Sequence, residues 1–209
     1  MPTITISDTM SRQRDQLNNA PDKANTALVL IDVINPIDFE GGGRLLEHAL
    51  PMAKALATLK RRAKAAKIPA VYVNDNFGRW RSDFRHLVEA FLQTGVRGKP
   101  IVEILQPEED DYFVLKPKHS AFHQTNLEIL LGYLGADTLI LTGMAGDICV
   151  LFSANDAYMR DFRLFIPPDC TASEDCQENQ RVLSLMSRVL KADLKQSAEL
   201  QFHQTRIVD

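Results

Sequence analysis

The sequence predicts a three-layer α/β/α fold built on a mostly parallel β-sheet. Two observations predict it. Short apolar runs alternate with helical patterns along the chain, and the runs are almost continuously apolar, as in strands that helices cover on both faces. The intervening helices supply the right-handed crossovers that parallel strands need. With 209 residues, 45% of them hydrophobic, the chain is long enough to bury one sizeable core.

The apolar runs predict five strands, each rich in β-branched and aliphatic residues. In chain order they are ALVLIDV (27–33), IPAVYVN (68–74), DYFVLK (111–116), TLILTG (138–143) and FRLFIP (162–167). None of these runs is long enough to cross a bilayer, so we expect no membrane-spanning segment and no membrane partner.

Helices are expected where apolar residues recur three and four positions apart, because that spacing places them on one helix face. The first stripe comprises Ala49, Met52, Ala53, Leu56, Leu59 and Ala63, whereas Lys54, Lys60, Arg61 and Lys64 fall on the other, outward face. Further helices are expected at about 83–93, 124–134, 149–159 and 177–191. The acidic loop QPEEDD (106–111) is expected to be a solvated connection.

Composition and charge favour a cytoplasmic protein with a small-molecule partner. Lys and Arg number 24 against 27 Asp and Glu, and no basic block suggests nucleic acid or an anionic membrane as a partner. The three cysteines are an odd number without CxxC spacing, which argues against a disulfide framework and a zinc site. Residues 1–24 lack an apolar signal segment and are expected to form a polar arm, followed by a single domain at 25–209.

Three side chains that can perform chemistry together follow different predicted strands. Asp32 lies near the end of the first strand, Lys116 ends the third, and Cys149 follows the fourth. Ligands of open parallel sheets bind beyond the carboxyl ends of the strands, so we expect these three side chains to meet there. Each also has a structural explanation: a turn or cap for the aspartate, a solvated strand end for the lysine, and apolar packing for the cysteine. Together they favour a nucleophilic site.

A cysteine attacks only as its thiolate, so its surroundings decide whether it is reactive. We expect a helix N-terminus and Lys116 to lower the pKa of Cys149, with Asp32 accepting the thiol proton. The small residues of GMAG (143–146) allow a sharp turn whose N–H groups can bind a substrate oxygen. We expect no metal and no other cofactor in this chemistry.

Several segments resemble the isochorismatase-like cysteine hydrolases, a family that includes nicotinamidases and N-carbamoylsarcosine amidase. They are ALVLIDVINPIDFEGGG, VLKPKHSAFHQTNLEILL and TLILTGMAGDICVLFSANDAYMRDF, followed by PPDCTAS. The resemblance covers residues 25–176 and implies a six-stranded parallel sheet with helices on both faces. It also implies a homo-oligomer, which we expect to be a dimer or a tetramer.

The resemblance implies roles for five residues: a catalytic triad of Asp32, Lys116 and Cys149, an oxyanion hole from the N–H groups of Ala145 and Cys149, and a place beside the substrate for Met144. It further implies a non-proline cis peptide at Met144–Ala145 that shapes the oxyanion hole. Lys118 competes for the lysine role, but Lys116 directly ends the strand and precedes the x-x-x-S-A-F pattern.

Departures from the family pattern narrow the expected activity. The Asp-x-His metal motif of nicotinamidases is replaced by VNDNFGRW (73–80), which has Asp75 but no histidine at the required spacing, so nicotinamidase activity is not expected. Gly146 stands where many amidases have Thr, and DVINP (32–36) replaces the commoner Asp-x-Gln. Cys149 argues against the true isochorismatases, because vinyl-ether hydrolysis needs no thiol.

Other side chains near the expected site allow two interpretations. Phe39 either lines the substrate pocket or packs under the EGGG loop. Arg79 and Trp80 either bind the substrate or lie at an oligomer contact or on plain surface. His119 and His123 are four residues apart, but we favour a structural role over a metal site because no carboxylate completes the ligand set.

The function expected from these observations is a metal-independent cysteine hydrolase. It would cleave a C–N bond of a small amide or ureido compound through a thioester intermediate. Two alternatives stay open. One is a vinyl-ether hydrolase that uses Asp32 as a general acid, and the other is a non-catalytic oligomeric binding protein.

Overall fold

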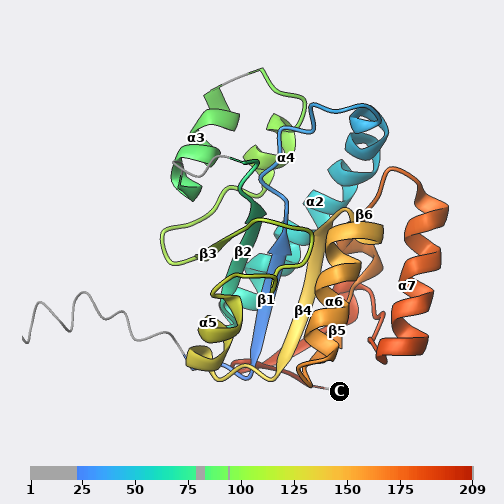
Figure 1. The fold of residues 1–209 in the computed structure, drawn as a ribbon. Coiled ribbons are helices and arrows are strands. Elements are labelled where there is room, and N and C mark those ends of the chain that lie inside the picture. Colours follow the sequence, from blue (N-terminus) through green and yellow to red (C-terminus); the bar gives the residue numbers. More distant parts are fainter. Residues whose placement is uncertain (1–22, 79–82, 94, 209) are drawn as a thin grey trace, which may run out of the picture.

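A six-stranded parallel β-sheet forms the centre of the computed structural model, which describes residues 23–78, 83–93 and 95–208 (Figure 1). The strands are β1 (Thr26–Ile31), β2 (Ala70–Asp75), β3 (Tyr112–Lys116), β4 (Thr138–Met144), β5 (Arg163–Phe165) and β6 (Thr171–Ala172). Their order is β3-β2-β1-β4-β5, and β6 pairs with β4. All of these pairings are parallel, so the predicted sheet is confirmed.

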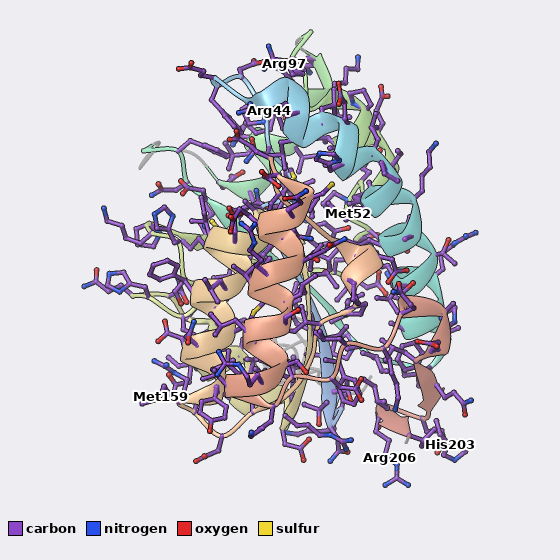
Figure 2. All side chains as sticks on the ribbon, turned by 90° about the vertical axis from the view of Figure 1, so that its right-hand side faces the viewer. Arg44, Met52, Arg97, Met159, His203 and Arg206 are labelled. Carbon is purple, nitrogen blue, oxygen red and sulfur yellow. The ribbon has the colours of Figure 1, made fainter. Side chains whose placement is uncertain are left out.

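Helices cover both faces of the sheet, and each face has its own hydrophobic core. Along β1, Leu28 and Leu30 belong to one core, while Val29 and Ile31 belong to the other. The first core is covered by α2 (Gly42–Ala65), α3 (Phe84–Gln93) and α4 (Lys99–Ile104), and the second by α5 (Leu127–Leu134), α6 (Leu151–Tyr158) and α7 (Cys176–Leu190). Figure 2 shows α6 and α7 side by side, with Met159 at the exposed end of α6. Burial on both faces explains why the strand sequences are continuously apolar.

Several short elements were not expected from the sequence. They are α4, β6 and an antiparallel hairpin of β7 (Gln201–His203) and β8 (Arg206–Val208). Each has too few residues to show a helical or alternating pattern. The helix expected from residue 149 begins earlier, with a π-helical turn, η1 (Gly146–Val150), that leads into α6. No helix among the described residues is long and apolar enough to cross a membrane.

The chain reverses its direction of travel across the sheet between β1 and β4. β2 and β3 lie on one side of β1, whereas β4 and β5 lie on the other. The ends of β1 and β4 meet at the pair Ile31 and Gly143, where Gly143 has φ 109° and a β-carbon would overlap the Ile31 backbone. The close approach brings the segments that follow β1 and β4 together, at the position where open α/β sheets bind ligands.

The acidic loop before β3 is largely exposed, as expected from the sequence, and its carboxylates also pair with lysines of α2. Lys64 Nζ lies 2.9 Å from Glu108, 2.5 Å from Asp110 and 3.2 Å from Asp111. Lys60 is only 4% exposed and forms an ion pair with Asp111, whose side chain is also buried. The expectation that Lys60 faces outward is therefore wrong, because the loop covers that side of α2.

Removing the buried carboxylate from this cluster tests its contribution to stability. Asp111→Ala is expected to lower the free energy of unfolding by about 3 kcal/mol, because the buried Lys60 charge loses its buried partner and keeps only the more exposed Glu108, at 3.2 Å. Denaturant unfolding followed by circular dichroism measures the change. Glu109→Ala is the matched control: Glu109 is exposed in the same loop, and its loss is expected to change stability by at most about 0.5 kcal/mol. Equal effects of the two substitutions would contradict the assignment.

Candidate active site

Asp32 is held in a fixed orientation at the carboxyl end of β1. It adopts the left-handed region with φ 52°, which aspartate tolerates better than most residues. Its N–H donates to the Val73 carbonyl at 2.9 Å, and its Oδ1 accepts the Asp75 N–H at 2.7 Å. These two bonds to β2 position a carboxylate that is only 4% exposed.

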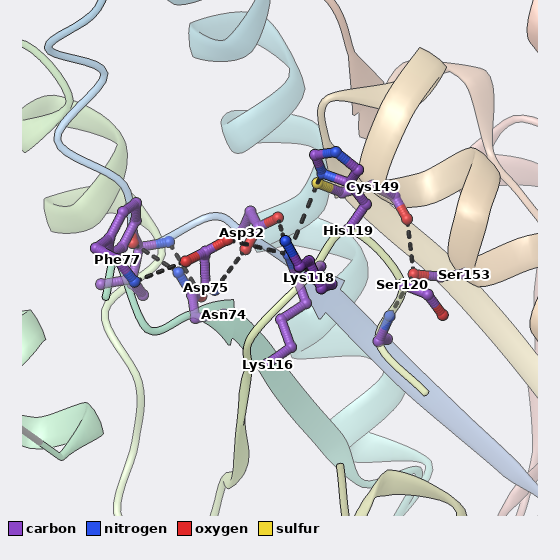
Figure 3. A network of polar contacts seen from close by, with 12 residues as sticks. Asp32, Asn74, Asp75, Phe77, Lys116, Lys118, His119, Ser120, Cys149 and Ser153 are labelled. Atoms are coloured by element: carbon purple, nitrogen blue, oxygen red, sulfur yellow. Dashed lines mark hydrogen bonds and ion pairs between the residues drawn. The ribbon is translucent and has the colours of Figure 1, made fainter. Parts of the chain in front are cut away.

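Lys116 is the last residue of β3, and its side chain reaches across the end of β2 to this carboxylate. Its Nζ lies 2.8 Å from Asp32 Oδ2 and 3.9 Å from Asp75 Oδ2, and it donates to the Lys118 carbonyl at 3.1 Å (Figure 3). The Lys116 side chain is fully buried, whereas Lys118 is exposed. Of the two lysines considered from the sequence, Lys116 is thus the one that contacts Asp32.

Cys149 lies in η1 and completes a cluster of three groups from separate parts of the chain. Its Sγ is 3.7 Å from Lys116 Nζ, and Asp32 is near enough to raise the pKa of the thiol. His119 Nδ1 lies 3.9 Å from the same sulfur atom (Figure 3). The structure therefore brings together the aspartate, lysine and cysteine that were expected to meet beyond the strand ends.

The turn between β4 and η1 contains the cis peptide bond expected at Met144–Ala145. The Ala145 carbonyl accepts the N–H groups of Ile148 at 3.2 Å and Val150 at 3.1 Å. The Cys149 carbonyl accepts the Ser153 hydroxyl at 2.6 Å. These bonds fix the backbone on both sides of Cys149, so the sulfur is presented from a well-defined turn.

The electrostatics of the site differ from those expected from the sequence. Burial and the neighbouring Asp32 raise the pKa of Cys149 to about 12, and Lys116 opposes this only in part. Burial also raises the pKa of Asp32, although Lys116 opposes it. Burial lowers the pKa of Lys116, but its contacts with Asp32 and Cys149 raise it further, and the net pKa is raised. The expectation of an acidic thiol is therefore wrong for the resting protein.

This arrangement is suited to proton transfer during nucleophilic attack, because the thiol keeps its proton at rest. A carboxyl group with a raised pKa can accept that proton and later return it, since it binds a proton more tightly than an ordinary carboxyl group does. The charged Lys116 next to Asp32 and Cys149 stabilises whichever of the two carries the negative charge.

The structure describes two of the four other residues that were predicted to contact the substrate. Phe39 is 43% exposed in the loop between β1 and α2, so it does not pack under that loop. Met144 is 1% exposed, and its side chain packs in the core beneath α2, which leaves only its backbone available to a substrate. Arg79 and Trp80 lie outside the described residues. Substrate contact stays a prediction for all four.

Two residues of the site have positions that the sequence did not indicate. His119 is exposed and lies beside Phe152, with ring centroids 5.5 Å apart, so its nearest reactive neighbour is the Cys149 sulfur and not a metal site. Asp75 anchors Asp32 through its backbone N–H, which no side-chain pattern could reveal. Among the described residues, no group of three or more His, Cys, Asp or Glu side chains could hold a metal ion.

Comparisons with known proteins relate this fold and site to a family. A family model described as the isochorismatase domain matches residues 26–193. The uncharacterized isochorismatase family protein YaaI of Bacillus subtilis (strain 168) is 40% identical over 172 residues, which is 82% of this chain and 94% of the relative. The ureidoacrylate amidohydrolase RutB of Methylobacterium radiotolerans is 27% identical over 177 residues, or 73% of this chain and 69% of the relative. The crystal structure of N-carbamoylsarcosine amidase from Thermoplasma acidophilum matches with a TM-score of 0.60 at 25% identity, covering 85% of this chain and 99% of that chain.

The fold and the matching relatives define the class of protein, which is an α/β hydrolytic enzyme. The family model spans most of the chain, and YaaI is similar over nearly its whole length, so the protein belongs to the isochorismatase family. The resemblance recognised in the sequence segments is confirmed. Membership of the family does not by itself assign the roles of individual residues or the bond that is cleaved.

The raised pKa of Cys149 predicts how its alkylation depends on pH. Below the pKa, the thiolate fraction rises tenfold per pH unit, so with a pKa of about 12 the iodoacetamide rate should still be rising at about pH 10. A model thiol with a pKa of about 8.5 levels off at lower pH. Mass spectrometry of the Cys149 peptide gives the rate at each pH.

Asp32→Asn serves as the comparison variant for this titration. The substitution removes a negative charge that disfavours the thiolate, so the rate profile of Cys149 is expected to shift to lower pH. A wild-type profile that levels off near that of the model thiol, or one that Asp32→Asn leaves unchanged, would contradict the electrostatic description of the site.

Proposed function

We propose that the protein is a metal-independent cysteine hydrolase that cleaves a C–N bond of a small amide or ureido compound. The observation that carries the proposal is the contact of Cys149 with the buried Asp32–Lys116 ion pair at the reversal point of the sheet. This contact brings a nucleophile, a proton acceptor and a fixed positive charge close to one another, as acyl transfer requires.

In the first step, Cys149 Sγ attacks the substrate carbonyl carbon while Asp32 accepts the thiol proton. The negative charge that develops on the carbonyl oxygen is stabilised by the N–H groups of Ala145 and Cys149, which follow β4. Lys116 keeps a positive charge beside Asp32 and the sulfur, so no uncompensated negative charge builds up in the buried site.

In the following steps, Asp32 first acts as an acid and then as a base. It donates its proton to the departing nitrogen, the C–N bond breaks, and a thioester remains on Cys149. Asp32 then accepts a proton from the water that attacks the thioester, the C–S bond breaks to release a carboxylic or carbamic acid, and Asp32 returns the proton to the Cys149 thiolate. The raised pKa of Asp32 suits this alternation, because a carboxyl group that binds a proton more tightly than usual accepts it more readily from the thiol and from water.

The names of the relatives support this substrate class. RutB is named for ureidoacrylate hydrolysis, and the structural neighbour from Thermoplasma acidophilum is an amidase for N-carbamoylsarcosine. Both names describe C–N bonds next to a carbonyl group. The isochorismatase of Bacillus subtilis is 33% identical over 129 residues, but this chain covers only 41% of its length. Vinyl-ether hydrolysis with Asp32 as the acid is therefore the alternative that experiments must separate.

Mass spectrometry of the intact protein tests the proposal directly. Incubation with a pooled set of small amides, imides and ureido compounds is expected to give an acyl adduct that peptide mapping assigns to Cys149. Cys149→Ala should form no adduct and lose turnover, and Asp32→Asn should lower kcat by roughly a hundredfold or more because the proton carrier is lost. Cys176→Ala is the control, since this exposed thiol on α7 should be dispensable.

Three outcomes would overturn the proposed mechanism. The first is full turnover of a confirmed amide by Cys149→Ala. The second is hydrolysis of isochorismate that survives Cys149→Ser but not Asp32→Asn, which would favour the vinyl-ether reaction. The third is a folded protein that forms no adduct and turns over no compound in the pool, which would favour a binding protein.

A further inference from the structure

We propose that Asn179 and Ser173 are positioning residues for the turn that carries Cys149, and that the Asn179 side chain takes the place of a side chain at Gly146. The inference rests on the proposed nucleophilic role of Cys149. Neither Asn179 nor Ser173 contacts the sulfur or its partners, so both act through the backbone of η1.

A buried chain of hydrogen bonds connects η1 to β6 and α7. The Asp147 N–H donates to Ser173 Oγ at 3.1 Å, and the Ser173 hydroxyl donates to Asn179 Oδ1 at 3.1 Å. Asn179 Nδ2 donates to the carbonyl and the hydroxyl oxygens of Thr171, each at 3.4 Å. Ser173 is 1% exposed, Thr171 5% and Asn179 9%. Buried hydrogen bonds of this kind hold the η1 backbone in place against Ser173 and Asn179.

Asn179 occupies the space that a side chain at Gly146 would need. A β-carbon built on Gly146 would overlap Asn179 Oδ1 and lie 3.2 Å from its Cγ and 3.3 Å from Ser173 Oγ. Gly146 does not have a left-handed φ, so an alanine would fit the backbone conformation. Glycine is needed for room and not for flexibility. This explains why Gly146 stands where the family pattern noted in the sequence has a threonine.

The network controls where the sulfur lies relative to the charged groups around it. Asp147 is two residues before Cys149, so a shift of its N–H moves the turn that presents Sγ. The groups that face the sulfur come from other elements: Asp32 after β1, Lys116 at the end of β3, and His119 in the loop beyond it. Asp75 at the end of β2 faces Lys116. A displacement of about 1 Å is enough to lower a reaction rate by roughly a hundredfold.

Two readouts of Asn179→Ala and Ser173→Ala separate positioning from general stability. If the turn relaxes, the thiol leaves the buried site and Asp32, so the pH profile of Cys149 alkylation should shift downward toward that of a model thiol. Cys149 should thus be alkylated more readily in these variants, whereas turnover should become slower. We expect kcat to fall by roughly tenfold to a hundredfold while KM stays within about threefold.

A double-mutant cycle tests the steric part of the proposal. Gly146→Ala alone should give the same alkylation shift, because the new β-carbon displaces Asn179. In the Asn179→Ala background that overlap is gone, so adding Gly146→Ala should change the alkylation profile little further. Additive effects of the two substitutions would show that Gly146 and Asn179 do not share one space, and would overturn this part.

The same protein supplies its own controls. Ser184→Ala removes an exposed hydroxyl on α7 that donates to the Gln180 carbonyl at 2.9 Å, and should leave both readouts unchanged. The alkylation rate of Cys176, in the first turn of α7, should not change in Asn179→Ala or Ser173→Ala. Parallel changes at Cys176 and Cys149 would show general loosening of α7 and would overturn the proposal, as would an unchanged Cys149 profile. The alkylation readout needs no substrate, so it is independent of whether amides are turned over.

Discussion

The ion pair between Asp32 and Lys116 is the interaction on which the rest of the site depends. Burying two charges costs several kcal/mol per ion, and only close contact with additional hydrogen bonds offsets that cost. Here the Asp75 N–H and the Lys118 carbonyl provide those bonds. The pair joins the end of β3 to the end of β1 across β2, so this strand order brings the two residues together. The order of the strands therefore places the charged groups of the site together.

The same pair affects the pKa of the Cys149 thiol. Burial and the nearby Asp32 disfavour the thiolate more than Lys116 favours it, so the thiol is protonated at rest, and in the proposed reaction Asp32 accepts its proton as the sulfur attacks. Such a site differs from one with a preformed thiolate, which reacts with many electrophiles. A Cys149 thiol that is protonated at rest, next to an Asp32 carboxyl group with a raised pKa, favours a nucleophile that reacts with its bound substrate and not with many electrophiles.

Much of the fold and the composition of the site could be predicted from the sequence, because both depend on local patterns. Continuous apolar runs indicate strands buried on both faces, and residues that follow parallel strands meet at one edge. The pKa of Cys149 could not be predicted, since its sign depends on burial and on the distance to Asp32. Lys60 was misassigned because helical periodicity does not show which loop covers a helix. The contact of Gly146 with Asn179 joins distant segments and leaves no local signal. The dimer or tetramer stays a prediction.

Infrared titration of the Asp32 carboxyl group measures the central claim most directly. The difference spectrum between the wild-type protein and Asp32→Asn isolates the band of this single group. The ion-pair account predicts that Asp32 protonates above the ordinary value of 3.8, and that Lys116→Met moves its titration to still higher pH because the opposing positive charge is lost. A band that titrates at the ordinary value in both proteins would show that Asp32 is neither buried beside Lys116 nor able to exchange a proton with Cys149 as described.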